Sequence, residues 1–311
     1  MTSSSIAVAI VNHNTRDALR DCLETVVAQT PAQTIVVDSA SSDGSPEMVR
    51  QEFPVVELRV SRNRGYGAAA NVALARARSD YVLLLNADTR VTPGALTALV
   101  EYLDQHPAAA FVGPRVVDAR GKAQKTAHHF PTPLQVFFRE SGLHKLRIAR
   151  RPASYATPHR VDWVLGAALA IRRRAFEGVG GFDESYFMYN EETDLCLRAR
   201  RMGWEVHFAP VATVVHVGGA STAQQRGAML AQYMRSTCLL YRHHLPPAKL
   251  RQLRLVLGVA LGARIVRDRG QLALAPGVER RRRLRENLEA WRVAWAALNE
   301  RGAPPGPPGA S

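Results

Sequence analysis

Short apolar runs alternate with stretches of helical periodicity between residues 5 and 90. The runs are rich in β-branched residues, which predicts buried strands. The stretches between them predict helices that start near Thr15, Ser45 and Gly65. Strands that alternate with helices in this way are typical of an α/β fold, with a mostly parallel sheet flanked by helices. The predicted strands are Ile6–Val11, Thr34–Val37, Val55–Val60 and Tyr81–Leu85.

The later part of the chain is less regular. A helix is predicted at Glu191–Met202, where Gly203 ends it, and the pattern after Ser221 is helical almost to the end. Further strands are predicted at Val161–Ile171, Val206–Phe208 and Thr213–Val217. We therefore predict three parts: an α/β domain over residues 1–245, a basic amphipathic helical extension over 246–301 and a disordered proline- and glycine-rich tail over 302–311.

The composition is that of a globular protein with a large core. The chain has 311 residues, of which 46% are apolar and 22% charged, and this excludes a disordered chain. Its three cysteines, Cys22, Cys196 and Cys238, lie far apart, which favours reduced thiols over a disulfide framework or a cysteine-based zinc site. The apolar run Ile6–Val11 lacks a preceding basic region and is too short for a signal peptide or a membrane span. We expect a cytoplasmic protein.

The formal net charge of +14 is unevenly distributed. Residues 1–138 hold thirteen basic and thirteen acidic side chains, whereas residues 242–311 hold fourteen basic and five acidic ones. Residues 139–174 are also basic, and residues 175–241 are slightly acidic. This partition argues against a general nucleic-acid coat and indicates a neutral core with a basic accessory surface.

Ligands of parallel sheets bind beyond the carboxyl ends of the strands, so the residues that follow each strand are candidates for a site. The turn after the first strand, Asn12–Thr15, has no glycine, so the dinucleotide-binding fingerprint is absent. Asn86 and Asp88 follow the strand at Tyr81–Leu85. A carboxylate there either binds a divalent cation that bridges a diphosphate or caps a turn or the helix that follows.

A second acidic group lies where the helix at Glu191 starts. Glu191, Glu192 and Asp194 fall within four residues, and carboxylates at a helix start interact favourably with the helix dipole. Neighbouring like charges also raise one another's pKa, as a general base facing a sugar hydroxyl requires. His216, at the end of a predicted strand, is either a core residue or a ligand. The residues alone leave these alternatives open.

Seven motifs in this order resemble those of family 2 glycosyltransferases with the GT-A fold, and most closely those of bacterial rhamnosyltransferases. The resemblance covers about residues 5–245. The motifs are Val11–Asn14, Val37–Ser45, Asn63–Asn71, Leu85–Asp88, Gly180–Glu184, Glu191–Leu195 and His216.

The resemblance implies a hexosyltransferase that moves a sugar, rhamnose favoured, from a nucleotide-diphosphate donor to a hydroxyl of a glycan or polyprenyl-linked acceptor, with inversion in one displacement. It places the metal at Asp88 and His216, with Asn86 where the family more often has a second carboxylate. Imidazole ligation favours Mn²⁺ over Mg²⁺. The residues that the resemblance assigns to the nucleotide are His13, Asp38, Asn63, Gly65 and Asn86.

The family's acidic pair falls on Glu191 and Glu192, and the resemblance implies that Glu192 is the base. Asp194 and Arg198 are four residues apart on one helix, so we expect them to form a supporting ion pair. Trp163 and Gly166 precede the acidic pair and are candidates for the acceptor pocket, with an ordinary core role for Trp163 equally open.

The C-terminal region combines a run of four arginines, Arg280–Arg283, with Leu284, Leu288, Trp291 and Trp295 at helical spacing. A cationic helix with an apolar stripe either lies on an anionic membrane surface, here the inner face of the plasma membrane, or packs on the core. We expect no nucleic-acid partner, because no nucleic-acid-binding motif is present. The alternative function is a non-catalytic GT-A-like protein that binds anionic lipid or nucleic acid through this region. The oligomeric state is not predicted.

Overall fold

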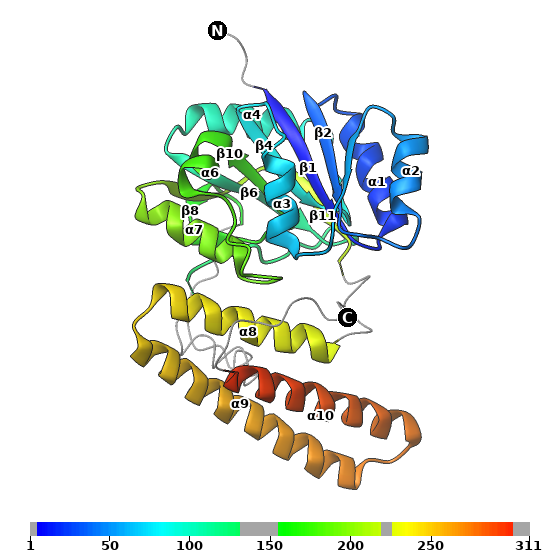
Figure 1. Cartoon of the computed structure of the whole chain (residues 1–311), viewed down its shortest axis with the longest axis vertical. Helices are drawn as coiled ribbons and strands as arrows, with labels where there is room; N and C mark the ends of the chain where they lie inside the picture. The colour runs from blue at the N-terminus through cyan, green and yellow to red at the C-terminus, as the bar shows by residue number, and fades with distance from the viewer. Residues whose placement is uncertain (1–4, 131–154, 219–225, 301–311) are drawn as a thin grey trace. The chain divides into compact units, whose positions relative to one another are not determined.

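The computed structural model describes residues 5–130, 155–218 and 226–300 (Figure 1). The chain forms two units. The α/β unit comprises Met1–Phe130, Ala153–Glu184 and Glu191–Ser221, and the helical unit comprises Pro131–Pro152, Ser185–Asn190 and Thr222–Ser311. The predicted tail over 302–311 and most of the basic stretch after residue 139 lie outside the described residues. The boundary that we predicted at residue 245 falls inside the helical unit.

The α/β unit is built on one large sheet, and its strand order is β3-β2-β1-β4-β10-β6-β11-β5, with β8 paired to β11. The first four of these strands run parallel to one another, while β10 is antiparallel to both of its neighbours. The fold is therefore α/β with a mostly parallel sheet, as predicted. The strands are β1 (Ile6–Asn12), β2 (Gln33–Asp38), β3 (Glu57–Val60), β4 (Tyr81–Asn86), β5 (Thr89–Val91), β6 (Ala109–Val117), β8 (His159–Arg160), β10 (Ala168–Arg172) and β11 (Glu205–His216).

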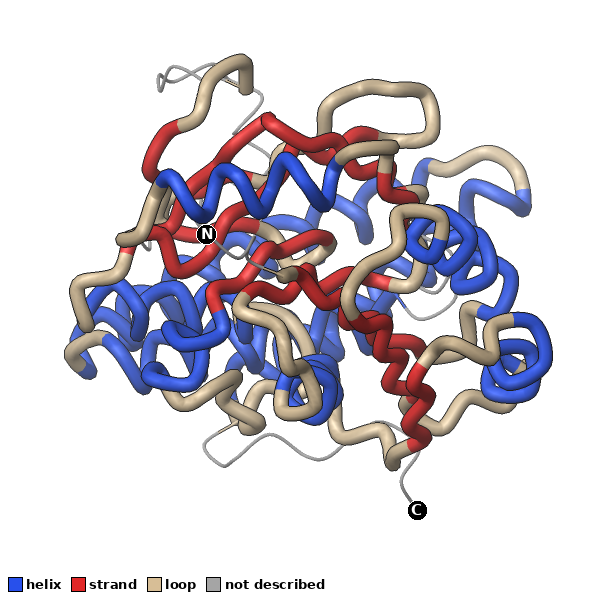
Figure 2. The backbone as a smooth tube through the Cα atoms, turned by 90° about the horizontal axis from the view of Figure 1, so that it is seen from above, coloured by secondary structure: helices blue, strands red, loops and turns tan. Residues whose placement is uncertain are grey.

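Helices cover both faces of this sheet (Figure 2). In β1, Ile6, Val8 and Ile10 face one core, and Ala7 and Ala9 face the other, as the two-residue period of a strand requires. The first core includes α1 (Arg16–Val27), α2 (Ser45–Glu52) and α4 (Ala95–Gln105); the second includes α3 (Tyr66–Leu74), α6 (Arg173–Val179) and α7 (Glu191–Arg201).

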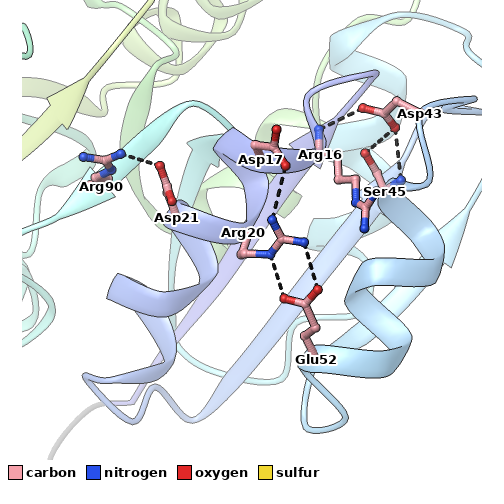
Figure 3. Close-up of polar contacts among 8 residues, drawn as sticks. All are labelled: Arg16, Asp17, Arg20, Asp21, Asp43, Ser45, Glu52 and Arg90. Atoms are coloured by element: carbon pink, nitrogen blue, oxygen red, sulfur yellow. Dashed lines mark hydrogen bonds and ion pairs between the residues drawn. The ribbon is translucent and has the colours of Figure 1, made fainter.

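One ion pair joins the first two helices, and hydrogen bonds of Asp43 join the loops that precede them. Figure 3 shows Arg20 of α1 donating two hydrogen bonds to Glu52 of α2, at 2.7 and 2.9 Å. Asp43 accepts from the backbone N–H of Arg16 at 2.8 Å and from the Ser45 hydroxyl at 2.6 Å. The loops that follow β1 and β2 are thereby held together.

The apolar run Val161–Ile171 does not form one strand, so that prediction was wrong. It is divided into β9 (Trp163–Val164), which pairs with β7 (Ala127–His128) in a second small sheet, and β10. Between them, the Leu165 N–H donates to the Thr126 carbonyl, and the Ala167 carbonyl accepts from Asn86. Likewise, the two strands predicted at Val206–Phe208 and Thr213–Val217 are one strand, β11, with a register shift between Phe208 and Thr213.

The helical unit consists of α8 (Arg226–His244), α9 (Pro247–Leu274) and α10 (Val278–Asn299), which share one apolar core. The stripe predicted on α10 is mostly buried: Leu284, Leu288 and Trp291 are 6%, 7% and 4% exposed, and Trp291 lies in the shared core. The Trp291 indole N–H donates to buried Asp268 of α9 at 2.9 Å. Among the described residues, no helix is both long enough and apolar enough to span a membrane.

Candidate active site

The loops after β1 and β2 meet at the carboxyl edge of the sheet. Asn12 donates from Nδ2 to Asp38 Oδ2 at 2.7 Å, and the Ser41 backbone N–H donates to Asp38 Oδ1 at 2.8 Å. Asp38 is therefore buried with both oxygens hydrogen-bonded. The neighbouring His13 donates from Nδ1 to the Ser39 carbonyl at 2.8 Å and its ring is exposed. An exposed ring held at its edge in this way can stack on a planar ligand.

Gly65 directly precedes α3, and another residue could not adopt its backbone conformation without strain. Its φ of 101° and ψ of 169° fall in a region that is almost restricted to glycine. The Gly65 N–H donates to Asn63 Oδ1 at 3.2 Å, which fixes the turn. Asn63 and Gly65 therefore fix the backbone of the turn that leads into α3.

Asp88 and His216 lie side by side although they are far apart in the sequence. The pairing of β5 with β11 puts Thr89 opposite His216, and the imidazole Nε2 is 3.3 Å from Asp88 Oδ1. On the other side of the ring, Nδ1 is 3.0 Å from Gln124 Oε1, while Gln124 Nε2 donates to the His216 carbonyl at 2.8 Å. Because the amide is oriented by that second bond, Nδ1 carries the proton and donates to Gln124.

This arrangement fits a divalent cation. When His216 is neutral and carries its proton on Nδ1, the Nε2 lone pair faces the carboxylate of Asp88, and a cation between the two atoms would satisfy both. Two ligands at neighbouring corners of an octahedral site lie about 3 Å apart, close to the separation of these atoms. A hydrogen bond from the far ring nitrogen is also the usual way to orient a histidine ligand. Asn86 precedes the pair and offers an amide in place of a second carboxylate.

Glu191 and Glu192 open α7 and are 6% and 8% exposed. Burial raises the pKa of Glu192 to about 7, although backbone N–H groups, including that of Gly166, oppose the rise. Burial, followed by the charge of Glu192, raises the pKa of Glu191 well above its ordinary value. Glu191 Oε2 has no hydrogen-bond partner among the described residues. Two adjacent carboxyl groups are thus held in an environment that favours the protonated form.

Tyr66 connects the two acidic groups. Its hydroxyl donates to the Gly166 carbonyl at 3.1 Å. The pKa of Tyr66 is raised well above its ordinary value by burial and then by the charges of Glu191, Glu192 and Asp88. The Tyr66 hydroxyl is therefore within electrostatic reach of all three carboxyl groups, so the predicted metal ligand and the predicted acidic pair lie near the same side chain.

Asp194 and Arg198 form the ion pair that their spacing predicts. Arg198 Nε donates to buried Asp194 Oδ2 at 2.8 Å. Its two terminal nitrogens donate to the carbonyls of Val179 and Gly181, at 2.8 and 2.7 Å. The pair therefore ties α7 to the end of α6 and to the loop that follows it.

Trp163 is half-buried and contacts the second core of the sheet with part of its ring. It stacks on His128 at a centroid distance of 4.3 Å, and its indole N–H donates to the His129 carbonyl at 3.0 Å. Gly166, three residues later, contributes the backbone groups that bond Tyr66 and Glu192. Both residues therefore lie on the connection that leads to the acidic pair.

The loop directly before Glu191 has a strained backbone. Tyr189 and Asn190 both have positive φ, 69° and 65°, which costs energy in residues other than glycine. This loop belongs to the helical unit, where α8 holds it. The Ser236 hydroxyl donates to the Met188 carbonyl at 2.6 Å, and Asn190 Nδ2 donates to the Thr237 hydroxyl at 3.2 Å.

Tyr66, Gln124 and Ser236 were not identified from the sequence. Tyr66 lies inside the motif Asn63–Asn71, so the motif is the signal that could have identified it. Nothing near Gln124 or Ser236 in the sequence points to a site, because each acts through a partner that only the folded chain brings close. The sequence motifs at Asn71 and Phe182 are also joined: Asn71 Nδ2 donates to the Phe182 carbonyl at 2.9 Å.

Comparison with known proteins identifies relatives that are named as rhamnosyltransferases. N-acetylglucosaminyl-diphospho-decaprenol L-rhamnosyltransferase of Mycobacterium tuberculosis is 31% identical over 235 residues, which are 68% of this chain and 75% of the relative. Rhamnosyltransferase WbbL of Escherichia coli is 26% identical over 224 residues, 68% of this chain and 83% of the relative.

Among solved structures, mannosyltransferase PcManGT from Pyrobaculum calidifontis, in complex with GDP-Man and Mn²⁺, superposes with a TM-score of 0.55. It is 18% identical, and the match covers 96% of this chain and 86% of that one. This likeness shows the GT-A fold.

The family model of Glycosyl transferase family 2 matches residues 7–180, more than half of the chain. The match includes both loops after β1 and β2, the turn before α3 and Asp88. The chain is therefore a glycosyltransferase and belongs to family 2.

Proposed function

We propose that this glycosyltransferase moves a hexose, rhamnose in preference, from a nucleotide-diphosphate donor to a hydroxyl of a polyprenyl-linked glycan, with inversion at the anomeric carbon. The sugar and the acceptor are suggested by the mycobacterial relative, whose name states L-rhamnose and an N-acetylglucosaminyl-diphospho-decaprenol. The observation that carries the chemistry is the buried Glu192, whose pKa of about 7 lies close to neutral pH.

In this proposal Glu192 is the general base. A base whose pKa lies near the working pH is present in its reactive form and still takes a proton readily. Its carboxylate removes the proton from the acceptor hydroxyl as the hydroxyl oxygen attacks the anomeric carbon. The bond from that carbon to the diphosphate oxygen breaks at the same time, and the diphosphate leaves with the electron pair.

Glu191 acts on the charge state of the pair. Burial and the charge of Glu192 raise its pKa well above that of an ordinary carboxyl group, so ionisation of one member of the pair disfavours ionisation of the other. One negative charge then faces the acceptor instead of two, which keeps Glu192 from being displaced by repulsion.

Asp88 and His216 would hold a divalent cation, and the imidazole favours Mn²⁺ over Mg²⁺. When bound there, the cation supplies positive charge to the diphosphate as it leaves. Gln124 would keep Nε2 of His216 turned toward Asp88, since its Oε1 accepts the hydrogen bond that Nδ1–H donates on the opposite side of the ring.

The remaining residues position the two substrates. The nucleobase would stack on the exposed His13 ring, and the buried Asp38–Asn12 pair would hold the loop that carries this ring. Asn63, Gly65 and Asn86 would contact the rest of the nucleotide, between the base and the metal ligands. Trp163 and Gly166 border the acceptor side, where the indole offers an apolar face to a sugar ring. A polyprenyl-linked acceptor would place the enzyme at the inner face of the plasma membrane.

The test is a pair of substitutions in the full-length chain. Glu192→Gln should abolish transfer and leave the donor nucleotide bound, because the amide keeps the shape but cannot take a proton. Glu177→Gln, an exposed carboxyl on α6, is the matched control and should leave transfer unchanged. Normal turnover by Glu192→Gln would refute the assignment of the base.

Calorimetry with and without Mn²⁺ tests the metal. The wild type should bind the nucleotide diphosphate more tightly with the ion, and Asp88→Ala should lose that difference. Nucleotide binding with no transfer from any donor sugar, even by the wild type, would favour the alternative of a non-catalytic GT-A-like protein.

A further inference from the structure

Helix α9 carries two apolar faces, and packing within the helical unit accounts for only one of them. Leu253, Leu257 and Leu261 are buried against α8 and α10. A second set of side chains faces solvent: Leu255, Val259 and Val266 are 70%, 57% and 72% exposed, and Leu274 is 86% exposed.

These exposed residues lie on one side of the helix. Leu255, Val259, Ala263, Val266 and Leu274 follow one another at spacings of four, four, three and eight residues, which keeps them within about a third of a turn at 3.6 residues per turn. We call these five residues the outer face of α9. At 1.5 Å per residue the outer face is about 28 Å long.

Trp295 of α10 extends this apolar surface. It is 41% exposed, and a Cβ at Gly258 or Gly262 would lie 3.7 or 3.8 Å from its ring. The two glycines therefore leave room for an indole beside the outer face. Indole rings favour the boundary between an apolar phase and water, because one part of the ring is apolar and the N–H is polar.

The exposed charges of α9 are positive. The helix contains six basic residues and one acidic residue, Asp268, which is 1% exposed and accepts from Trp291 and Arg267. Arg251, Arg267 and Arg269 are exposed on either side of the outer face. A long apolar strip with a cationic border is the arrangement by which helices lie in the surface of an anionic bilayer.

We infer that the outer face of α9 is a membrane-contact surface, which lies in the headgroup region of an anionic bilayer while Arg251, Arg267 and Arg269 meet lipid phosphates. Charge complementarity selects this occupant. A second copy of the chain would bring the same arginines together across a twofold axis, where like charges oppose association. The surface differs from the stripe that the sequence predicts on α10, and it is independent of the proposed reaction.

Sedimentation of the full-length chain with lipid vesicles tests this surface. The vesicles are phosphatidylcholine containing about one-third phosphatidylglycerol, with pure phosphatidylcholine for comparison. The wild type should bind the anionic vesicles, and Val259→Glu with Val266→Glu should weaken that binding at least tenfold. Val55→Glu is the matched control: Val55 is 74% exposed but lies in the α/β unit, so binding should be unchanged.

A second variant tests the cationic border without altering the apolar strip. Arg251→Gln with Arg269→Gln should weaken binding to anionic vesicles about fivefold for each charge at low salt, and leave binding to pure phosphatidylcholine unchanged. Circular dichroism confirms that each variant is folded.

Three results would overturn the inference: binding of Val259→Glu/Val266→Glu equal to that of the wild type, no binding of the wild type, or a wild-type dimer that this variant dissociates in sedimentation velocity. Transfer to a water-soluble acceptor separates this inference from the proposed function. The variant should keep that transfer while it loses vesicle binding, whereas an inactive wild type that binds vesicles would contradict the reaction and leave the surface intact.

Discussion

Glu192→Gln should make the protein more stable, and the gain should grow with pH. The substitution keeps the shape of the side chain and an acceptor for the Gly166 N–H, but it removes the group that must ionise in a buried position. In the folded chain Glu192 is 8% exposed and its pKa is about 7, whereas the ordinary pKa of a glutamate side chain is 4.5. The folded state therefore binds more protons than the unfolded state between these pH values.

The magnitude follows from linkage. Because the folded state holds the extra proton, the stability of the wild type falls as pH rises from about 4.5 to 7 and then stays low. The full difference is about 3 kcal/mol, since each tenfold change in an ionisation constant is about 1.4 kcal/mol. Glu192→Gln removes this loss, so the expected gain is about 3 kcal/mol at pH 8 and less than about 1 kcal/mol at pH 5.

Urea unfolding followed by circular dichroism at both pH values measures the gain. Glu177→Gln, on the surface of α6, is the control and should change the free energy of unfolding by less than about 0.5 kcal/mol at either pH. A gain of equal size at pH 5 and pH 8, or no gain, would show that Glu192 is not held in its protonated form by burial. The kcat/KM of the wild type should rise with pH through about 7, because only the ionised base takes the proton.

Other predictions concern the residues around the base and the metal ligands. Gln124→Leu should lower Mn²⁺ affinity, measured by calorimetry, about tenfold to a hundredfold, because it removes the acceptor that orients His216. Gly65→Ala should destabilise the chain by about 1–3 kcal/mol in urea and weaken nucleotide binding, because alanine is strained at a φ of 101°. Ser236→Ala should lower kcat and leave donor binding unchanged, since the loop before Glu191 loses its bond to α8. Trp163→Ala should raise the KM for the acceptor and leave the KM for the donor unchanged; the reverse pattern would place Trp163 on the donor side.

The first four strands and three helices were predictable because each is specified by local sequence. In β1, for example, Ile6–Val11 is an uninterrupted apolar run that polar residues follow. The break inside Val161–Ile171 was not predictable, because the residues between β9 and β10 are also apolar and their backbone groups pair with Thr126 and Asn86. β5 is only three residues long and exists because β11 pairs with it.

The same distinction applies to the site. Asp88 and Glu192 were found from motifs at the ends of a strand and the start of a helix, where their own neighbours signal a role. The contact of His216 with Asp88 depends on the pairing of β11, and the hydrogen bond to Gln124 depends on a loop far away in the sequence. The outer face of α9 was missed for another reason: apolar residues lie on both sides of that helix, so the sequence pattern does not reveal which side packs.

The two charged regions of the chain suit different anions. A donor diphosphate that approaches Asp88 meets acidic side chains near Tyr66, and in the proposed function a cation held by Asp88 and His216 would offset their charge. Arg251, Arg267 and Arg269 of α9 are not needed for that effect, and they border an apolar strip that a water-soluble diphosphate would not bind. Cations beside exposed leucine and valine fit a ligand that has an anionic part and an apolar part, and anionic bilayer lipids have both parts. Removal of the arginines should therefore change vesicle binding without changing the affinity for the donor nucleotide, and a parallel loss of both would show that the two regions bind the same ligand.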